Sequence, residues 1–316
     1  VSGNEILEAV KNGFDPRQIA FAGVGKTDKK IEVALENNIF SFNVESVPEL
    51  HAINSLAQKK NKKARIALRI NPNVDAHTHS YITTGLTENK FGIEEKHLPD
   101  ILQLLPTLNA VELIGIHFHI GSQITELSSF KKLCFKINEL QDYFESKGLW
   151  LEHINVGGGL GIDYEEPDAN PIADFSAYFS LFTNHLKLRN AQTLHFELGR
   201  SVVGQCGSLI SRVTYLKEGI LKNFVIIDAG MTDLIRPALY QAFHHIENLS
   251  STEEPAIYDV VGPICESSDI FVKDFELNKT KRGDIVAIRS AGAYGEVMAS
   301  RYNCRDFAKS YFSDTI

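Results

Sequence analysis

Polar and glycine-rich motifs stand at the ends of several apolar runs of this 316-residue sequence. Glycine lets a backbone approach an anion with its N–H groups pointing inward, while histidine and carboxylate side chains bind or transfer protons. Such motifs gathered at one edge of a sheet are typical of an active site. The motifs are Arg69–Pro72, His117–Gln123, Asn155–Gly161 and Glu197–Arg200.

Three consecutive glycines, Gly157–Gly159, follow one of these runs. They could cradle an anion such as a phosphate group, although ordinary tight turns also use glycine. Ser122 and Gly199 lie in two neighbouring motifs and are plausible further phosphate donors. Together the three loops favour a ligand that carries a phosphate group.

Glu197 ends an apolar run, where a carboxylate needs a partner. That partner is either a basic side chain such as Arg200 or a protonated ring nitrogen of a bound cofactor. We expect His117 and His119 to point to opposite faces of their strand, so that only one faces the protein interior. Each imidazole is either packed and neutral or stacked on an aromatic ligand.

Strand-like runs alternate with helical periodicity over the first two thirds of the chain, which predicts parallel βαβ units. The predicted strands are Ile19–Gly23, Ile39–Val44, Arg65–Ile70, Leu113–Ile120, His153–Val156 and Thr193–Glu197. The predicted helices are Glu5–Lys11, Lys29–Asn37, Val47–Gln58, Ser128–Ser146 and Ala173–Leu188.

Six such strands fit either a doubly wound sheet or part of a (β/α)8 barrel. The convergence of four motifs at strand ends favours the barrel. Two βα units, roughly 60 residues at about 30 per unit, would then be missing before Val1.

After Cys206 the pattern changes to strands without long helices. We therefore predict a barrel domain over residues 1–205 and a mostly-β domain over residues 206–316. The later strands are predicted at Ser208–Leu216, Phe224–Asp228, Ala256–Val261 and Asp284–Arg289.

The composition excludes several classes of protein. The net charge is −8 without a strongly basic block, which argues against nucleic-acid and anionic-membrane partners. The four cysteines are scattered, which predicts reduced thiols and a cytoplasmic location. His77 and His79 have no carboxylate cluster at metal-ligand spacing, so we predict no metal site.

Three further motifs lie in the predicted β domain, at Asp228–Tyr240, Gly262–Asp269 and Ser290–Gly295. In the second of these, Cys265 precedes Glu266 within a turn rich in glycine and proline. Either this pair is a proton donor beside an acid that binds an amine, or the cysteine is simply a buried thiol.

Five of the motifs, in this order and spacing, resemble the fold-type III decarboxylases that depend on pyridoxal phosphate (PLP). They are His-Ile-Gly-Ser-Gln, Gly-Gly-Gly-Leu-Gly, Glu-Leu-Gly-Arg, Cys-Glu-Ser-Ser-Asp and Ala-Gly-Ala-Tyr. The resemblance runs over the whole chain. The family pattern has Glu-Pro-Gly-Arg at Glu197–Arg200, so the leucine is a departure, but the charged groups are kept.

The resemblance implies a role for each motif. His119 would stack on the PLP ring, and Glu197 would bind its nitrogen. Cys265 would return a proton after carbon dioxide leaves, and Glu266 would bind the distal ammonium group of the substrate. Both would act in the site of the other subunit of a homodimer. The phosphate group of PLP would be held by Ser122, Gly159, Gly199 and Tyr294, together with the backbone of Gly157, Gly158, Leu198 and Arg200.

The distal carboxylate of the substrate would be bound by Arg200, Arg236 and Tyr240, near Tyr294.

The resemblance also places the lysine that forms the Schiff base upstream of Val1. Lys26 and Lys90 lie in recognisable motifs, but neither matches that lysine. We therefore expect an N-terminally truncated piece that is inactive by itself.

Substrate choice follows from the charges at the far end of the molecule. A distal amino-acid end needs an arginine for its carboxylate and an acid for its ammonium group, whereas ornithine needs only the acid. Arg236 beside Arg200 therefore favours decarboxylation of meso-2,6-diaminopimelate to L-lysine and carbon dioxide, unless Arg236 caps a helix or pairs with Asp233. The alternatives are a sister decarboxylase for ornithine, arginine or carboxynorspermidine, and a catalytically silent homologue that binds a partner subunit.

Overall fold

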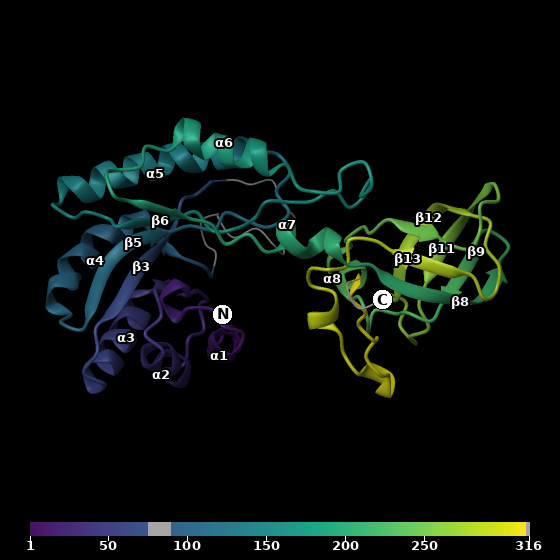
Figure 1. Ribbon diagram of the computed structural model, residues 1–316, viewed down its shortest axis with the longest axis horizontal. Coiled ribbons are helices and arrows are strands. Elements are labelled where there is room, and N and C mark those ends of the chain that lie inside the picture. The colour runs from purple at the N-terminus through teal and green to yellow at the C-terminus, as the bar shows by residue number, and fades with distance from the viewer. Residues whose placement is uncertain (75–89, 314–316) are drawn as a thin grey trace. The chain divides into compact units, whose positions relative to one another are not determined.

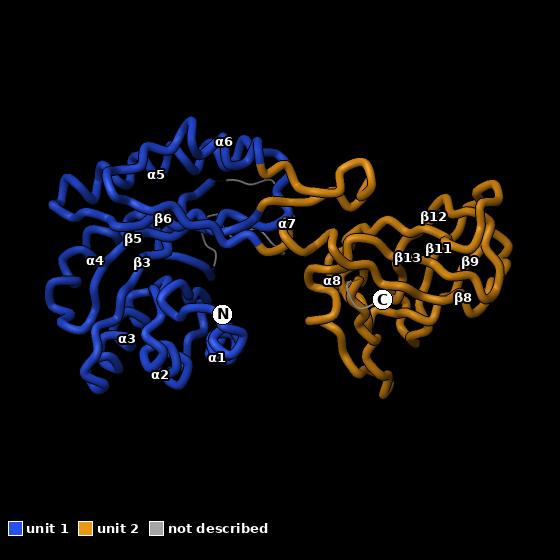
Figure 2. The backbone as a smooth tube through the Cα atoms, viewed as in Figure 1, with its two compact units in different colours: residues 1–159, 176–198 blue, residues 160–175, 199–316 orange. Residues whose placement is uncertain are grey.

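The computed structural model describes residues 1–74 and 90–313, which form two compact units. The first unit comprises residues 1–159 and 176–198, and the second comprises residues 160–175 and 199–316 (Figure 2). The loop 160–175 thus belongs with the C-terminal part of the chain, which the βα pattern did not indicate. The proposed domain boundary at residues 205 and 206 remains a prediction. His77 and His79 lie outside the described residues.

The first unit is built on a parallel sheet whose six main strands pair in the order in which they occur along the chain. A doubly wound sheet reverses its strand order part-way, whereas a barrel keeps it sequential. The barrel-type fold and all six predicted strands are therefore confirmed. The strands are β1 Ala20–Phe21, β2 Ser41–Val44, β3 Ala64–Asn71, β5 Val111–His117, β6 His153–Asn155 and β7 Thr193–His195, with the short β4 Ile93–Glu94 beside β3.

Helices connect these strands and lie around the sheet (Figure 1). A capping box between Ser2 and Glu5 starts the first helix, and the hydroxyl of Ser46 accepts from the Glu49 N–H at the start of the third. The five predicted helices are confirmed, but the short α4 was missed because two prolines flank its few apolar residues. The helices are α1 Gly3–Lys11, α2 Asp28–Glu36, α3 Val47–Lys59, α4 Leu98–Leu104, α5 Ser128–Ser146 and α6 Phe175–His185.

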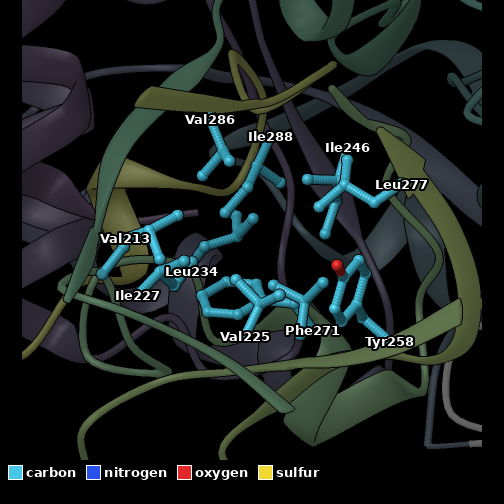
Figure 3. Close-up of a cluster of buried hydrophobic side chains, with 12 residues drawn as sticks. Val213, Val225, Ile227, Leu234, Ile246, Tyr258, Phe271, Leu277, Val286 and Ile288 are labelled. Carbon is cyan, nitrogen blue, oxygen red and sulfur yellow. The ribbon is translucent and has the colours of Figure 1, made fainter. Parts of the chain in front are cut away.

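The second unit is a six-stranded sheet in the order β10-β13-β8-β9-β11-β12, antiparallel except for the pair β9 and β11. Its buried side chains, among them Val225, Tyr258 and Ile288, converge in one core (Figure 3). The expected mostly-β fold is confirmed, although β10 and β12 were not predicted. The strands are β8 Leu209–Glu218, β9 Asn223–Ile227, β10 Ile246–Asn248, β11 Pro255–Val261, β12 Ile270–Asn278 and β13 Ile285–Ile288, with short helices α7 Arg200–Val203 and α8 Arg236–Tyr240.

Among the helices within residues 1–74 and 90–313, none combines the length and the apolar character that a bilayer crossing requires.

Gly115 lies in β5 directly opposite His153 of β6. A Cβ atom at this position would lie 2.3 Å from the carbonyl oxygen of His153, an atom that cannot rotate away. We expect Gly115→Ala to lower the free energy of unfolding by about 3 kcal/mol, measured by urea denaturation. Gly25→Ala is the control, because no atom lies within 4 Å of its Cβ position; equal stability of the two variants would contradict the packing argument.

Candidate active site

The loops that follow β5, β6 and β7 continue side by side beyond the ends of the strands. The Phe118 N–H donates to the Asn155 carbonyl, the Val156 N–H to the His195 carbonyl, and the Glu197 N–H to the Gly157 carbonyl. Because the parallel strands end at the same edge, three of the polar motifs meet there.

The Glu197 carboxylate is held by side chains from three different strands. Its Oε1 accepts hydrogen bonds from Asn155 Nδ2 at 2.9 Å and Asn43 Nδ2 at 3.2 Å, and its Oε2 lies 3.4 Å from Nε2 of the buried His117. Burial raises the pKa of this carboxyl, but His117 and the Asn155 amide outweigh burial and lower the pKa to about 2. Among the described residues no lysine or arginine forms an ion pair with it, and 33% of the side chain remains exposed, so a ligand can reach an ionised carboxylate.

His117 and His119 act on the same carboxylate, so the expectation that they point to opposite faces was wrong. Residues two apart on a strand share a face, and both imidazoles lie close enough to Glu197 to influence its pKa. Nδ1 of His119 accepts from the Gly158 N–H at 3.3 Å, and burial, with Arg69 and His117 adding to it, lowers the pKa of His119 to about 4. His119 is therefore a neutral imidazole.

The three consecutive glycines are needed because three loops pack against one another. A Cβ atom would lie 2.2 Å from the Phe118 carbonyl oxygen at Gly157, and 2.4 Å from the Glu197 carbonyl oxygen at Gly158. The N–H of Gly157 donates to Asn155 Oδ1 and that of Gly158 to His119. Among the described residues the N–H of Gly159 has no such acceptor, so it is the member of the loop best able to donate to a phosphate.

The second unit gathers two arginines around one tyrosine. Arg200 Nη1 and Arg236 Nη1 donate to the Tyr164 hydroxyl at 2.6 and 2.9 Å, and all three side chains are buried. The ring of Tyr294 lies 5.0 Å from the Arg200 guanidinium carbon. The Tyr294 backbone has a φ of 58°, a left-handed conformation that is uncommon outside glycine and often marks functional sites.

The pairing of Arg236 with Asp233, which the sequence left open, is not seen. Asp233 instead accepts from the Gly230 N–H and lies 3.6 Å from Arg305. Arg236 is the first residue of α8, and Tyr240 is the last. Among the described residues no carboxylate forms an ion pair with Arg236.

The loop that carries Cys265 and Glu266 is fixed by the buried Asp269. The Asp269 carboxylate accepts hydrogen bonds from the N–H groups of Ile264 and Met231 at 2.7 and 2.6 Å. The same carboxylate leaves room only for glycine at position 262, because a Cβ atom there would lie 2.3 Å from Asp269 Oδ2. Cys265 and Glu266 are exposed on this loop, which excludes the alternative of a buried thiol. The Tyr302 hydroxyl donates to Glu266 at 2.8 Å.

The predicted site residues thus fall into two groups. His119, Ser122, the glycine loop, Glu197 and Leu198 belong to the first unit, and Gly199, Arg200, Arg236, Tyr240, Cys265, Glu266 and Tyr294 belong to the second. Sequence reasoning missed Asn43, Tyr164 and His244, since each is an ordinary residue type that gains meaning from a partner distant in the chain. Asn155 lay within a quoted motif but received no role.

The comparison with known families decides the assignment. The model described as pyridoxal-dependent decarboxylase, pyridoxal binding domain, matches residues 1–204. The chain belongs to this family. Its cofactor is PLP, as predicted.

Relatives of this pyridoxal-dependent decarboxylase align with almost all of the chain. It is 59% identical to the diaminopimelate decarboxylase of Bacteroides thetaiotaomicron, over 100% of this chain and 82% of that relative. It is 42% identical to the diaminopimelate decarboxylase of Aquifex aeolicus, over 96% of this chain and 72% of that relative. The crystal structure of diaminopimelate decarboxylase from Helicobacter pylori complexed with L-lysine superposes with a TM-score of 0.89 at 44% identity, covering 96% of this chain and 75% of that one.

The residues of this decarboxylase fit a pyridine ring that carries a phosphate group. An ionised carboxylate that forms no ion pair with a described lysine or arginine suits a protonated ring nitrogen, and a neutral imidazole suits stacking on the ring. Lys26, by contrast, is fully engaged in the structure: its Nζ is buried and donates to the carbonyls of Gly23 and Asn43 and to Glu49 at 2.6 Å. Lys90 is exposed.

Removing one amide should show what keeps Glu197 ionised. The folded-state pKa of about 2 is below the ordinary value of 4.5, so Glu197 favours the folded state above pH 4.5 and loses this contribution as the pH falls towards 2. We expect Asn155→Leu to raise this pKa by roughly one pH unit, read by NMR titration of carbon-13-labelled glutamate. Asn138→Leu, which removes an amide bound to the His185 carbonyl, is the control; an unaltered Glu197 pKa in Asn155→Leu would refute the assignment.

Proposed function

We propose that this protein catalyses the last step of lysine biosynthesis, the PLP-dependent decarboxylation of meso-2,6-diaminopimelate to L-lysine and carbon dioxide. The observation that carries the choice of substrate is the buried pair Arg200 and Arg236, which share the hydroxyl of Tyr164. Buried guanidinium groups are costly unless an anion binds them, and a planar carboxylate matches their geometry. The names of relatives up to 59% identical agree with this substrate.

Bound PLP supplies an electron sink that makes loss of carbon dioxide possible. In our proposal Glu197 accepts a hydrogen bond from the ring nitrogen and keeps it protonated, which its low pKa supports. Neutral His119 packs on the ring face. The phosphate is held by Ser122, Gly159, Gly199 and Tyr294, with the backbone of Gly157, Gly158, Leu198 and Arg200.

The substrate is bound by its far end and reprotonated at its reacting carbon. Arg200, Arg236 and Tyr240, next to Tyr294, bind the distal carboxylate, and Glu266 binds the distal ammonium group. The thiol of Cys265 donates a proton to the carbon from which carbon dioxide has departed. The exposure of Cys265 and Glu266 on a loop fixed by Asp269 supports these roles, because a ligand can reach both side chains from the solvent.

We further propose that the protein is a homodimer in which Cys265 and Glu266 complete the site of the partner subunit. We also assign it to the cytoplasm, where thiols stay reduced; the four cysteines are free thiols in the structure.

The decisive test is lysine release by the product of the whole gene, supplied with PLP and either meso-diaminopimelate, ornithine or arginine. We expect lysine from diaminopimelate and no turnover of the other two. Turnover of ornithine or arginine instead would indicate a sister decarboxylase, and no turnover at all would indicate a silent homologue.

Replacing one arginine tests the choice of substrate. We expect Arg236→Ala to raise KM for diaminopimelate at least tenfold, because a charge-assisted contact to the distal carboxylate is lost. Arg282→Ala is the control, since Arg282 is exposed and its Nε donates to the Thr214 carbonyl, away from the proposed site residues. An unchanged KM in Arg236→Ala would oppose diaminopimelate as the substrate.

Subunit mixing tests the shared site. We expect Cys265→Ala and Glu197→Ala to be nearly inactive alone, and to regain roughly a quarter of wild-type activity after they are unfolded together and refolded. Half of the random dimers would then contain one intact site out of two. No recovery, although mass spectrometry detects mixed dimers, would place Cys265 and Glu197 in the same subunit's site.

A further inference from the structure

The buried side chains of Tyr164 and His244 surround the guanidinium of Arg236, and neither has a role in the function proposed above. Arg236 Nη1 donates to the Tyr164 hydroxyl at 2.9 Å and contacts His244 Nε2 at 2.8 Å. Its guanidinium carbon lies 4.9 Å from the Tyr164 ring centre, and the His244 ring packs edge-on against that ring with centroids 4.8 Å apart.

The hydrogen bonds fix the protonation state of His244. A guanidinium can only donate, so His244 Nε2 must accept, and His244 Nδ1 must carry the hydrogen that it donates to the Arg289 carbonyl at 2.9 Å. Burial lowers the pKa of His244 to about 4; the Arg289 carbonyl opposes this effect and Arg236 adds to it. The imidazole is therefore neutral at physiological pH and adds no third positive charge.

The same contacts determine which edge of Arg236 is open. Both hydrogens of Nη1 are engaged, one by Tyr164 and one by His244. Among the described residues Nε and Nη2 of Arg236 have no acceptor. These two nitrogens form the edge that binds a carboxylate with two parallel hydrogen bonds.

Tyr164 in turn holds a second guanidinium and is itself held in place. Its hydroxyl accepts from Arg200 Nη1 at 2.6 Å, and its carbonyl accepts from the His245 N–H at 3.1 Å. Arg289 forms an ion pair at 2.6 Å with Asp168, four residues further along the same loop. The loop 160–175 is thus tied to the strand end that also fixes His244.

We propose that Tyr164 and His244 are positioning residues that orient Arg200 and Arg236 as one receptor for a carboxylate, and so determine specificity for ligands with a carboxylate at the distal end. This inference rests on the proposed function and deepens it. Two like charges side by side repel, and a neutral acceptor shared by both holds them together without neutralising either. A carboxylate partner in place of Tyr164 would compete with the ligand.

Two ligands that differ by one carboxylate test this proposal. L-Lysine carries the group and 1,5-diaminopentane lacks it, and calorimetry on the PLP-loaded product of the whole gene gives a Kd for each. We expect Tyr164→Phe to weaken L-lysine binding roughly tenfold or more while 1,5-diaminopentane binding stays within about twofold. Tyr215→Phe, at an exposed tyrosine of β8 in the same unit, should alter neither Kd.

Two substitutions of His244 test the proposal independently, one that removes the acceptor for Arg236 and one that restores it. Leucine at this position removes the acceptor for Arg236, whereas glutamine can present an amide oxygen close to the position of Nε2. We expect His244→Leu to weaken L-lysine binding selectively and His244→Gln to restore most of it. PLP content and melting temperature are recorded for every variant, so that a variant that does not fold is recognised and the other position decides.

The possible failures are distinct. An unchanged L-lysine Kd in Tyr164→Phe and His244→Leu, or an equal loss for both ligands, overturns the inference, since a general loosening of the site would weaken both. A wild type that binds L-lysine no better than 1,5-diaminopentane also overturns it. Failure of the wild type to release lysine from diaminopimelate would instead reject the proposed function. That outcome is distinct, because the inference depends on the ratio of the Kd values for L-lysine and 1,5-diaminopentane and not on turnover.

Discussion

Much of the first unit follows from the need to keep one carboxylate ionised without an ion pair to a lysine or arginine among the described residues. Partial burial opposes the charge of Glu197, and the His117 imidazole and the Asn155 amide outweigh this effect. The donors come from β2, β5 and β6, so their convergence depends on strand register. Asn155 pairs with His117 on one side and with His195 on the other, and a slip of one residue would turn the amide away from the carboxylate.

The second unit holds positive charges instead of a negative one, and it too holds them with hydrogen bonds. Two buried guanidinium groups are held by a phenol and, for Arg236, by a neutral imidazole, none of which cancels the positive charge. Among the described residues Glu197 forms no ion pair with a lysine or arginine, and Arg236 forms none with a carboxylate. Each charge stays available for a ligand of opposite sign, and the geometry is fixed before the ligand arrives.

The sequence predicted what depends on local patterns and missed what depends on distant ones. Strands β2 and β3 are almost entirely buried, and their short runs rich in Ile, Leu, Val, Phe and Ala were recognised although polar residues interrupt them. Strand β12 was missed because Lys273, Asp274 and Glu276 interrupt its apolar pattern. Asn43 and Glu197 are 154 residues apart and Tyr164 and Arg236 are 72 apart, so no spacing rule could pair them. The motifs identified the neighbourhood of the chemistry, whereas the partners that tune it required the fold.

The loop 160–175 has a consequence for how such a protein can be divided or recombined. The chain passes between the two units after residues 159, 175 and 198, so no single cut separates them. A chimaera that exchanged everything after residue 198 would keep Tyr164 and Asp168 but lose their partners Arg200, Arg236 and Arg289. Exchange of the β unit between relatives therefore requires two grafts made together, and the sixteen-residue loop has to evolve with the distant half of the sequence rather than with its own neighbours.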